Sequence, residues 1–157
     1  KKIMKARRIA IFGLGNSAAI AIDAQHKFLR AGLDAAAYYD NHMQAIAASH
    51  LTNDDVAIGI SHSGSSIDVV EALKLSKESG ATTICITNFG KSPIIKQSDI
   101  VLFTASEETR YTILGMNSRI AQLAIIDTIH TYIVLHKSHA GVKAIQATEK
   151  ALQSKKY

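Results

Sequence analysis

The sequence predicts an α/β domain, a three-layer α-β-α sandwich built around a five-stranded parallel sheet. Short apolar runs alternate along the chain with longer segments that have helical periodicity. The runs lack the alternation of polar and apolar residues that a half-exposed strand shows, so both faces of each strand should be covered. Strands that alternate with helices are typical of a parallel sheet with helices on both sides.

The first half of the chain supplies three strands and three helices. Gly32 and Gly80 are placed to end the first and third helices, and Asp40 and Asn41 are candidates to cap the second. The expected elements are a strand at 8–12, a helix at 17–31, a strand at 35–39, a helix at 42–49, a strand at 56–60 and a helix at 66–79.

The second half adds two strands, at 82–87 and 100–103, with a short helix between them. Pro93 lies near the start of that helix, where its missing N–H costs no hydrogen bond. Two longer helices follow, at 118–135 and 141–154.

The helix at 118–135 is apolar nearly all round, which is typical of a helix buried on every side. Either a partner subunit or the segment 141–154 is expected to cover it. The first alternative predicts a homodimer or homotetramer.

The composition of the chain excludes several classes of protein. A chain of 157 residues that is 47% hydrophobic suits one domain and excludes a disordered chain. No run of about 18 apolar residues is present to cross a bilayer. The single cysteine, Cys85, excludes an internal disulfide and a multi-cysteine metal site. The six histidines other than His62 lack metal-ligand spacing, and no metal and no cofactor is expected.

Two loops that follow strands contain the candidate ligand-binding residues. Residues 13–17 read Gly-Leu-Gly-Asn-Ser and residues 61–66 read Ser-His-Ser-Gly-Ser-Ser, and each loop opens a helix. Ligands of open parallel sheets bind outside the carboxyl ends of the strands. Free N–H groups and the dipole at a helix start favour an anion, and hydroxyl groups add donors without charge. The two loops therefore predict an anion site.

Other interpretations of these loops are weaker. The third glycine of a dinucleotide fingerprint would fall at Ala18, and only Asp34 and Asp40 are candidates for its acidic residue. No Gly-Lys-Ser/Thr follows, which excludes a P-loop. Helix capping needs one serine, whereas residues 61–66 hold four.

The two loops resemble a known family. Gly-x-Gly-x-Ser at 13–17 and Ser-x-Ser-Gly-x-Ser at 61–66, leading into a helix with Asp68 and Glu71, resemble the SIS (sugar isomerase) phosphosugar-binding domain over about residues 8–135. Further details resemble the effector domain of RpiR-type bacterial transcription regulators. These are Asn16 in the first loop, Lys-Phe-x-Arg-x-Gly at 27–32, Ile-x-Ile-Thr-Asn at 84–88, Ser-Pro at 92–93, Ser-Asp at 98–99, Glu107, Ser-Arg at 118–119 and Ile-Asp at 126–127.

The resemblance implies a flavodoxin-like SIS fold for the whole chain and a set of ligand-binding residues. Ser17, Ser61, Ser63 and Ser66 would hold a phosphate, assisted by backbone N–H groups near Gly64 and Ser65. Glu107, with Glu108 as the weaker alternative, follows the last strand on the ligand side, where a carboxylate can accept hydrogen bonds from sugar hydroxyls. Many members carry Glu-Thr where this chain has Ser65 and Ser66. The full expected set is Gly15, Asn16, Ser17, Ser61, His62, Ser63, Gly64, Ser65, Ser66 and Glu107.

Two functions fit this resemblance. In the first, the chain is the phosphosugar sensor of a cytoplasmic transcriptional regulator of carbohydrate metabolism. That regulator would bind DNA only through an N-terminal helix-turn-helix domain outside this chain, which begins at Lys1 in a basic, linker-like stretch. In the second, it is an aldose–ketose phosphosugar isomerase, which would need Glu107 or His62 as a base. The family details favour the sensor, so no residue is assigned a catalytic role.

Overall fold

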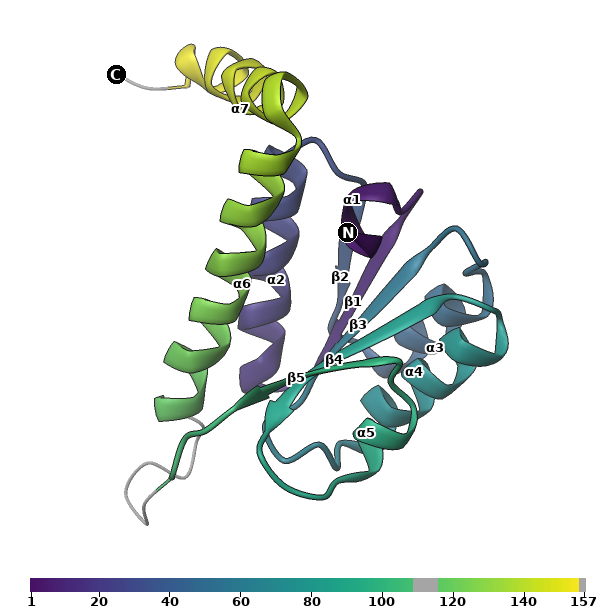
Figure 1. The fold of residues 1–157 in the computed structure, drawn as a ribbon. Coiled ribbons are helices and arrows are strands. Elements are labelled where there is room, and N and C mark those ends of the chain that lie inside the picture. The colour runs from purple at the N-terminus through teal and green to yellow at the C-terminus, as the bar shows by residue number, and fades with distance from the viewer. Residues whose placement is uncertain (109–115, 156–157) are drawn as a thin grey trace.

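The structure, a computed structural model, describes residues 1–108 and 116–155. At its centre the described residues form a sheet of five strands in the order β2-β1-β3-β4-β5, and all neighbouring strands are parallel (Figure 1). The strands are β1 (Ile9–Gly13), β2 (Ala35–Tyr38), β3 (Val56–Ile60), β4 (Thr82–Asn88) and β5 (Ile100–Thr104). The predicted parallel sheet is confirmed.

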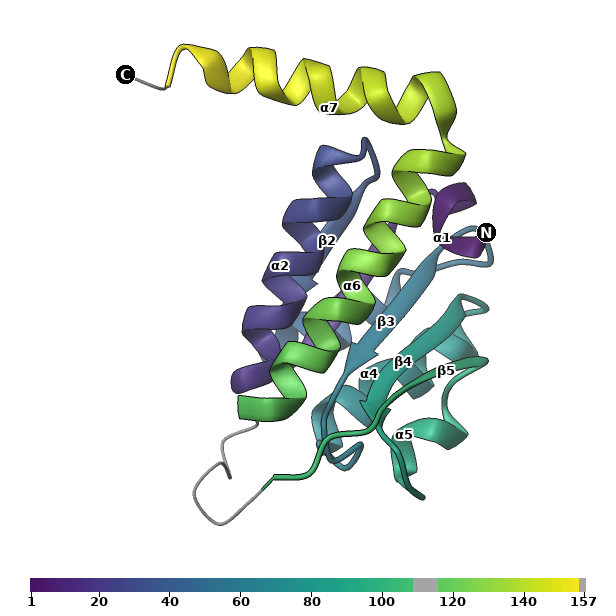
Figure 2. The ribbon, with the colours of Figure 1, turned by 60° about the vertical axis from the view of Figure 1, so that its left-hand side comes forward.

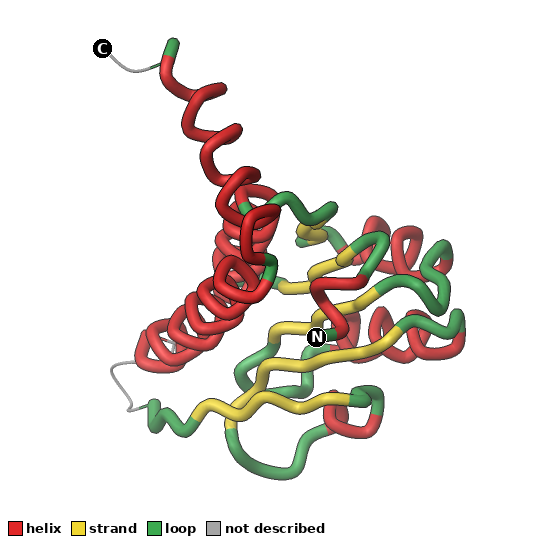
Figure 3. Tube along the Cα trace, turned by 45° about the horizontal axis from the view of Figure 1, so that its top comes forward, coloured by secondary structure: helices red, strands yellow, loops and turns green. Residues whose placement is uncertain are grey.

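Helices cover both faces of the sheet, which confirms the three layers (Figure 3). One face carries the short α1 (Lys2–Lys5) with α2 (Asn16–Arg30) and α6 (Met116–His136). The other carries α3 (Asn41–Ser49), α4 (Ile67–Glu78) and α5 (Pro93–Lys96), and α7 (Ser138–Gln153) ends the chain. The expected elements differ from these bounds by at most three residues, and α1 was not predicted.

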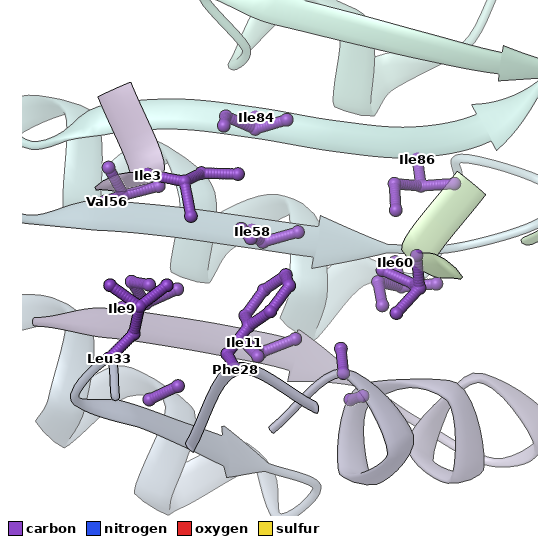
Figure 4. Packing of buried hydrophobic residues seen from close by; sticks show 14 of the residues in the cluster. Ile3, Ile9, Ile11, Phe28, Leu33, Val56, Ile58, Ile60, Ile84 and Ile86 are labelled. Atoms are coloured by element: carbon purple, nitrogen blue, oxygen red, sulfur yellow. The ribbon is translucent and has the colours of Figure 1, made fainter. Parts of the chain in front are cut away.

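Alternate residues of each central strand enter separate cores. Ile9 and Ile11 of β1 pack with Phe28 of α2, in the cluster that Figure 4 shows. Ala10 and Phe12 point the other way, toward α3 and α4. Every residue of β1 and β3 is buried, as their continuous apolar sequences predict.

On the face of the sheet that α3, α4 and α5 cover, small residues let α4 approach the sheet closely. A Cβ added at Gly59 of β3 would lie 2.6 Å from Leu73 Cδ1 of α4. The lone thiol, Cys85, is buried on this same face, and burial raises its pKa. In this position Cys85 packs as a small apolar side chain.

The orientation of α6 corrects one expectation. Ile126 and Ile133 are buried against the sheet, whereas Ile120 is 71% exposed and Leu135 is 70% exposed. The last helix does not cover them, because α7 crosses the ends of α6 and α2 and then runs away from the body (Figure 2). Within the described part of the chain, the outer face of α6 therefore stays uncovered, and the expected burial under 141–154 is wrong.

None of the helices that the structure describes combines the length and the apolar character that a membrane span needs.

Candidate functional site

The two candidate loops leave the sheet side by side. The strand order reverses between β1 and β3, because β2 lies on one side of β1 and β3 lies on the other. Gly13, at the end of β1, is in register with Ile60, at the end of β3. This is the topological switch point at which open α/β sheets bind ligands.

Glycines shape the first loop. A Cβ at Gly13 would lie 2.6 Å from the backbone oxygen of Ser17, so the chain turns here only without a side chain. Gly15 has a φ of +54° and precedes the first turn of α2 without a side-chain cap. That turn contains no acidic residue. The loop thus presents the positive end of a long helix, with the half-buried Ser17 inside its first turn.

The second loop pairs two of its hydroxyl groups. Ser61 is buried, and its Oγ lies 3.1 Å from the Oγ of Ser66. One hydroxyl of such a pair donates to the other, which leaves one proton free for a ligand. The exposed Ser63 and Ser65 are bonded to each other: Ser65 N donates to Ser63 Oγ at 3.3 Å, and Ser65 Oγ donates to the Ser63 carbonyl at 3.2 Å.

Helix capping does not explain these serines. Ser66 occupies the N-cap position of α4, yet among the described residues its side chain makes no hydrogen bond to the first turn of that helix. By contrast, Asp40 caps α3 as predicted, accepting a hydrogen bond from Met43 N at 2.9 Å. The first turn of α4 is therefore free of a side-chain cap.

Gly64 fixes the second loop against the β4–α5 connection. Its φ is +63°, and an added Cβ would lie 2.6 Å from Ser92 Cβ and 2.8 Å from Thr87 Oγ1. Its carbonyl accepts a hydrogen bond from Ile94 N at 3.1 Å. The buried Gly64 therefore fixes the second loop against the β4–α5 connection, while Ser63 and Ser65 are exposed to solvent.

His62 is turned partly into the protein. Its carbonyl accepts hydrogen bonds from Asn88 N at 3.0 Å and from Thr87 Oγ1 at 3.3 Å. Its Nδ1 is buried and has no hydrogen-bond partner in the part of the chain that the structure describes.

The two glutamates after β5 have different surroundings. Glu108 Oε1 accepts a hydrogen bond from Ser118 N at 3.0 Å, at the start of α6. The carbonyl of Glu107 accepts one from Asn117 Nδ2 at 2.9 Å, and the Glu107 residue is exposed. Glu107 thus lies at the same carboxyl-terminal end of the sheet as the loops, but β4 separates β5 from β3, and among the described residues no hydrogen bond joins Glu107 to either loop.

Residues at the end of β4 were missed by sequence reasoning. Thr87, Asn88 and Ser92 all contact the second loop or its supports. The signal was present, because Thr87 and Asn88 are polar residues at the carboxyl end of a buried strand, the same rule that selected the other two loops. Across residues 1–108 and 116–155, no group of three metal-ligating side chains is assembled.

Comparisons with known proteins agree with this geometry. Residues 2–132 match the family model of the SIS domain. Over 154 residues the chain is 40% identical to an uncharacterized HTH-type transcriptional regulator of Caldanaerobacter subterraneus, covering 98% of this chain and 55% of that protein. Over 125 residues it is 42% identical to the HTH-type transcriptional regulator RpiR of Escherichia coli K12, covering 78% and 42%.

A solved structure extends the comparison to the fold. The Vibrio vulnificus NanR protein complexed with ManNAc-6P superposes with a TM-score of 0.92 and 23% identity, over 99% of this chain and 58% of that one. The chain spans about half the length of the curated relatives that it matches.

Proposed function

This chain belongs to the SIS domain family, and from that premise we propose that it is the phosphosugar-binding effector domain of a DNA-binding transcriptional regulator of carbohydrate metabolism. The observation that carries the proposal is the pair of adjacent loops at the switch point, whose serines do not cap the helices that follow. Hydroxyl and N–H donors at two helix starts suit a phosphate dianion.

The proposed phosphate site uses no side-chain cation. Residues 13–17 and 61–66 contain neither lysine nor arginine. Ser17, Ser63 and the Ser61–Ser66 pair supply the hydroxyl donors, together with backbone N–H groups of both loops. Neutral donors hold an anion by hydrogen bonds without a fixed counter-charge, and such reversible binding suits a sensor of metabolite concentration.

The sugar end of the ligand is assigned to the segment after β5. Glu107 is exposed at the same carboxyl-terminal end of the sheet, and a carboxylate accepts hydrogen bonds from sugar hydroxyls. Glu108 is not chosen because its carboxylate already accepts a hydrogen bond from the start of α6.

The regulator assignment rests on the relatives. Two curated relatives are HTH-type regulators about twice as long as the matched segment. We therefore place DNA binding in a helix-turn-helix domain outside this chain, and the whole protein in the cytoplasm with its operator. Neither His62 nor Glu107 has a catalytic role in this proposal.

The uncovered face of α6 is assigned to a homodimer. At 100° per residue, Ile120, Ala124 and Leu135 lie on one side of the helix together with Thr128 and Thr131, and all five are exposed. Asp127, which is also exposed, lies about 20° from Ile120 at the border of this side and pairs with Lys27 of α2. An apolar cavity of about 270 Å³ beside it, lined by Leu102 and Ile129 among others, extends the apolar surface to the sheet edge. A dimer through this face should bury at least about 1,000 Å².

The test is a thermal-shift and calorimetric screen of this chain with fructose 6-phosphate, glucose 6-phosphate and ManNAc-6P, each against its unphosphorylated sugar. A binder present at 100 times its Kd should add about 2.7 kcal/mol to the free energy of unfolding. Equal responses to phosphorylated and unphosphorylated sugars would contradict the proposal.

Two variants and an activity assay complete the test. Ser63→Ala should remove most of the response, whereas Ser49→Ala, an exposed serine at the end of α3, should leave it unchanged. Interconversion of an aldose–ketose phosphate pair that disappears in both His62→Ala and Glu107→Gln would instead establish an isomerase.

A further inference from the structure

We propose that Asn88 is a positioning residue that holds the Glu107 segment at a fixed place relative to the second loop, so that the sugar and phosphate ends of one ligand are read together. The inference rests on the proposed function, because it assigns Asn88 a role in that same site. Nothing in the motif of residues 13–17 or 61–66 points to it.

The backbone of Asn88 is bonded to the second loop. Its N–H donates to the His62 carbonyl at 3.0 Å, beside the hydrogen bond that Thr87 Oγ1 donates to the same oxygen. These bonds tie the end of β4 to residue 62, between the buried Ser61 and the exposed Ser63. A substitution of the Asn88 side chain leaves the backbone bond in place.

The side chain of Asn88 is bonded to the segment after β5. Its Oδ1 accepts from Ser106 N at 3.0 Å and from Thr104 Oγ1 at 3.2 Å, and its Nδ2 donates to the Ser106 carbonyl at 3.0 Å. The amide thus holds both backbone groups of Ser106, the residue before Glu107. Only a side chain with a donor and an acceptor on one plane makes both bonds.

The same segment is anchored on its other side by α6. Asn117 Nδ2 donates to the Glu107 carbonyl, and Ser118 N donates to Glu108 Oε1. Residues 106–108 are therefore held between Asn88 and the start of α6. The proposed phosphate loop, Asn88, the Glu107 segment and α6 form one continuous series of hydrogen bonds.

Loss of the Asn88 side-chain amide removes the hydrogen bonds that hold one side of residues 106–108. Glu107 keeps its side chain but loses its fixed distance from the second loop, and the ligand must then order the segment when it binds. The proposal therefore predicts weaker binding of a whole sugar phosphate with unchanged binding of phosphate alone. A general loosening of the domain would weaken both.

The experiment compares Asn88→Ala with the parent chain by titration calorimetry, using inorganic phosphate and the tightest binder among fructose 6-phosphate, glucose 6-phosphate and ManNAc-6P. Asn88→Ala should bind the sugar phosphate about tenfold more weakly and inorganic phosphate within twofold of the parent. Asn53→Ala, an exposed asparagine in the turn before β3, is the matched control and should change neither. Equal losses for both ligands, or no loss, would overturn the proposal.

A double-mutant cycle tests that Asn88 acts through Glu107. Asn88→Ala combined with Glu107→Gln should bind no more weakly than the weaker single variant, because both changes remove one function. If the two losses multiply, Asn88 does not act through Glu107.

Amide hydrogen exchange separates this inference from the proposed function, since it needs no ligand. Asn88→Ala should speed exchange of Ser106 N–H and Ser118 N–H and leave Gly64 N–H, which donates to Ser61 at 3.2 Å, unchanged. Unchanged exchange at Ser106 and Ser118 would overturn the positioning role even if every sugar phosphate binds. Faster exchange in a chain that binds no phosphate would instead contradict the proposed function alone.

Discussion

Gly64→Ala is the substitution for which the structure gives the clearest cost. The φ of +63° is strained for any residue with a Cβ, by about 1 kcal/mol. The added Cβ would also lie 2.6 Å from Ser92 Cβ, which no side-chain rotation moves away, and 2.8 Å from Thr87 Oγ1. Overpacking of this kind costs about 1–3 kcal/mol, so the total should be about 2–4 kcal/mol.

Urea denaturation of the parent and variant chains measures this loss. Gly80→Ala is the matched control, because its φ is +92° but its nearest contact would be an ordinary 3.7 Å from Asn53 N. That variant should lose only the strain, about 1 kcal/mol. Ser92→Gly in the Gly64→Ala background removes the closest contact and should recover part of the difference. If Gly64→Ala is no more destabilising than Gly80→Ala, the close approach of the second loop to the β4–α5 connection is wrong.

Two further predictions concern a buried acid and the outer face of α6. Burial alone would raise the pKa of Asp55, but hydrogen bonds from Arg7 and from the backbone and hydroxyl of Thr52 hold it below its ordinary value. Its contribution to stability is therefore present above the unfolded pKa, about 3.9, and is lost as the pH falls through the lower folded pKa. In urea denaturation at pH 7, Asp55→Asn should have a lower free energy of unfolding than the parent. The difference between the two chains should shrink as the pH falls below about 4. A difference that stays constant with pH would contradict this. In light scattering, Ile120→Asp should give a folded monomer, whereas Ile126→Asp should unfold the chain because Ile126 is fully buried; an unchanged dimer in Ile120→Asp would exclude that face.

The layers of the fold could be predicted from the sequence because burial on two faces leaves a local signal. The strands at 9–13 and 56–60 are apolar at nearly every position, and this pattern can be read without knowledge of the order of the strands in the sheet. The adjacency of the two loops followed from a general rule about the carboxyl ends of parallel strands. The helix α1 was missed because four residues are too few to show a period.

The environment of α6 could not be predicted from its composition. Ser118 and Gln122 are buried while Ile120 and Leu135 are exposed, the reverse of what hydrophobicity favours. The two polar residues share a side of the helix with Ile126 and Ile133, and packing of those isoleucines against the sheet fixes its rotation. In a helix that is apolar nearly all round, no sequence pattern selects that side.

The contacts that support the second loop could not be predicted from the sequence, although the polar residues at the end of β4 could have been selected. Gly64, Ser92 and Asn88 meet only because the β4–α5 connection folds back against the turn after β3. Each residue belongs to a short motif of its own segment, but no motif shows that the three segments meet. Contacts between separate loops depend on tertiary approach, which local propensities do not encode.

The central claim is that the two loops at the switch point bind the phosphate of a sugar phosphate. The most direct measurement is a titration of the ¹⁵N-labelled chain with the tightest sugar phosphate of the screen and with its unphosphorylated sugar, followed by amide chemical shifts. We expect shifts concentrated at residues 13–18 and 61–68 with the phosphorylated ligand and none there with the sugar alone. Shifts confined to other surfaces, such as the groove between α3 and α4, or equal shifts with both ligands, would contradict it.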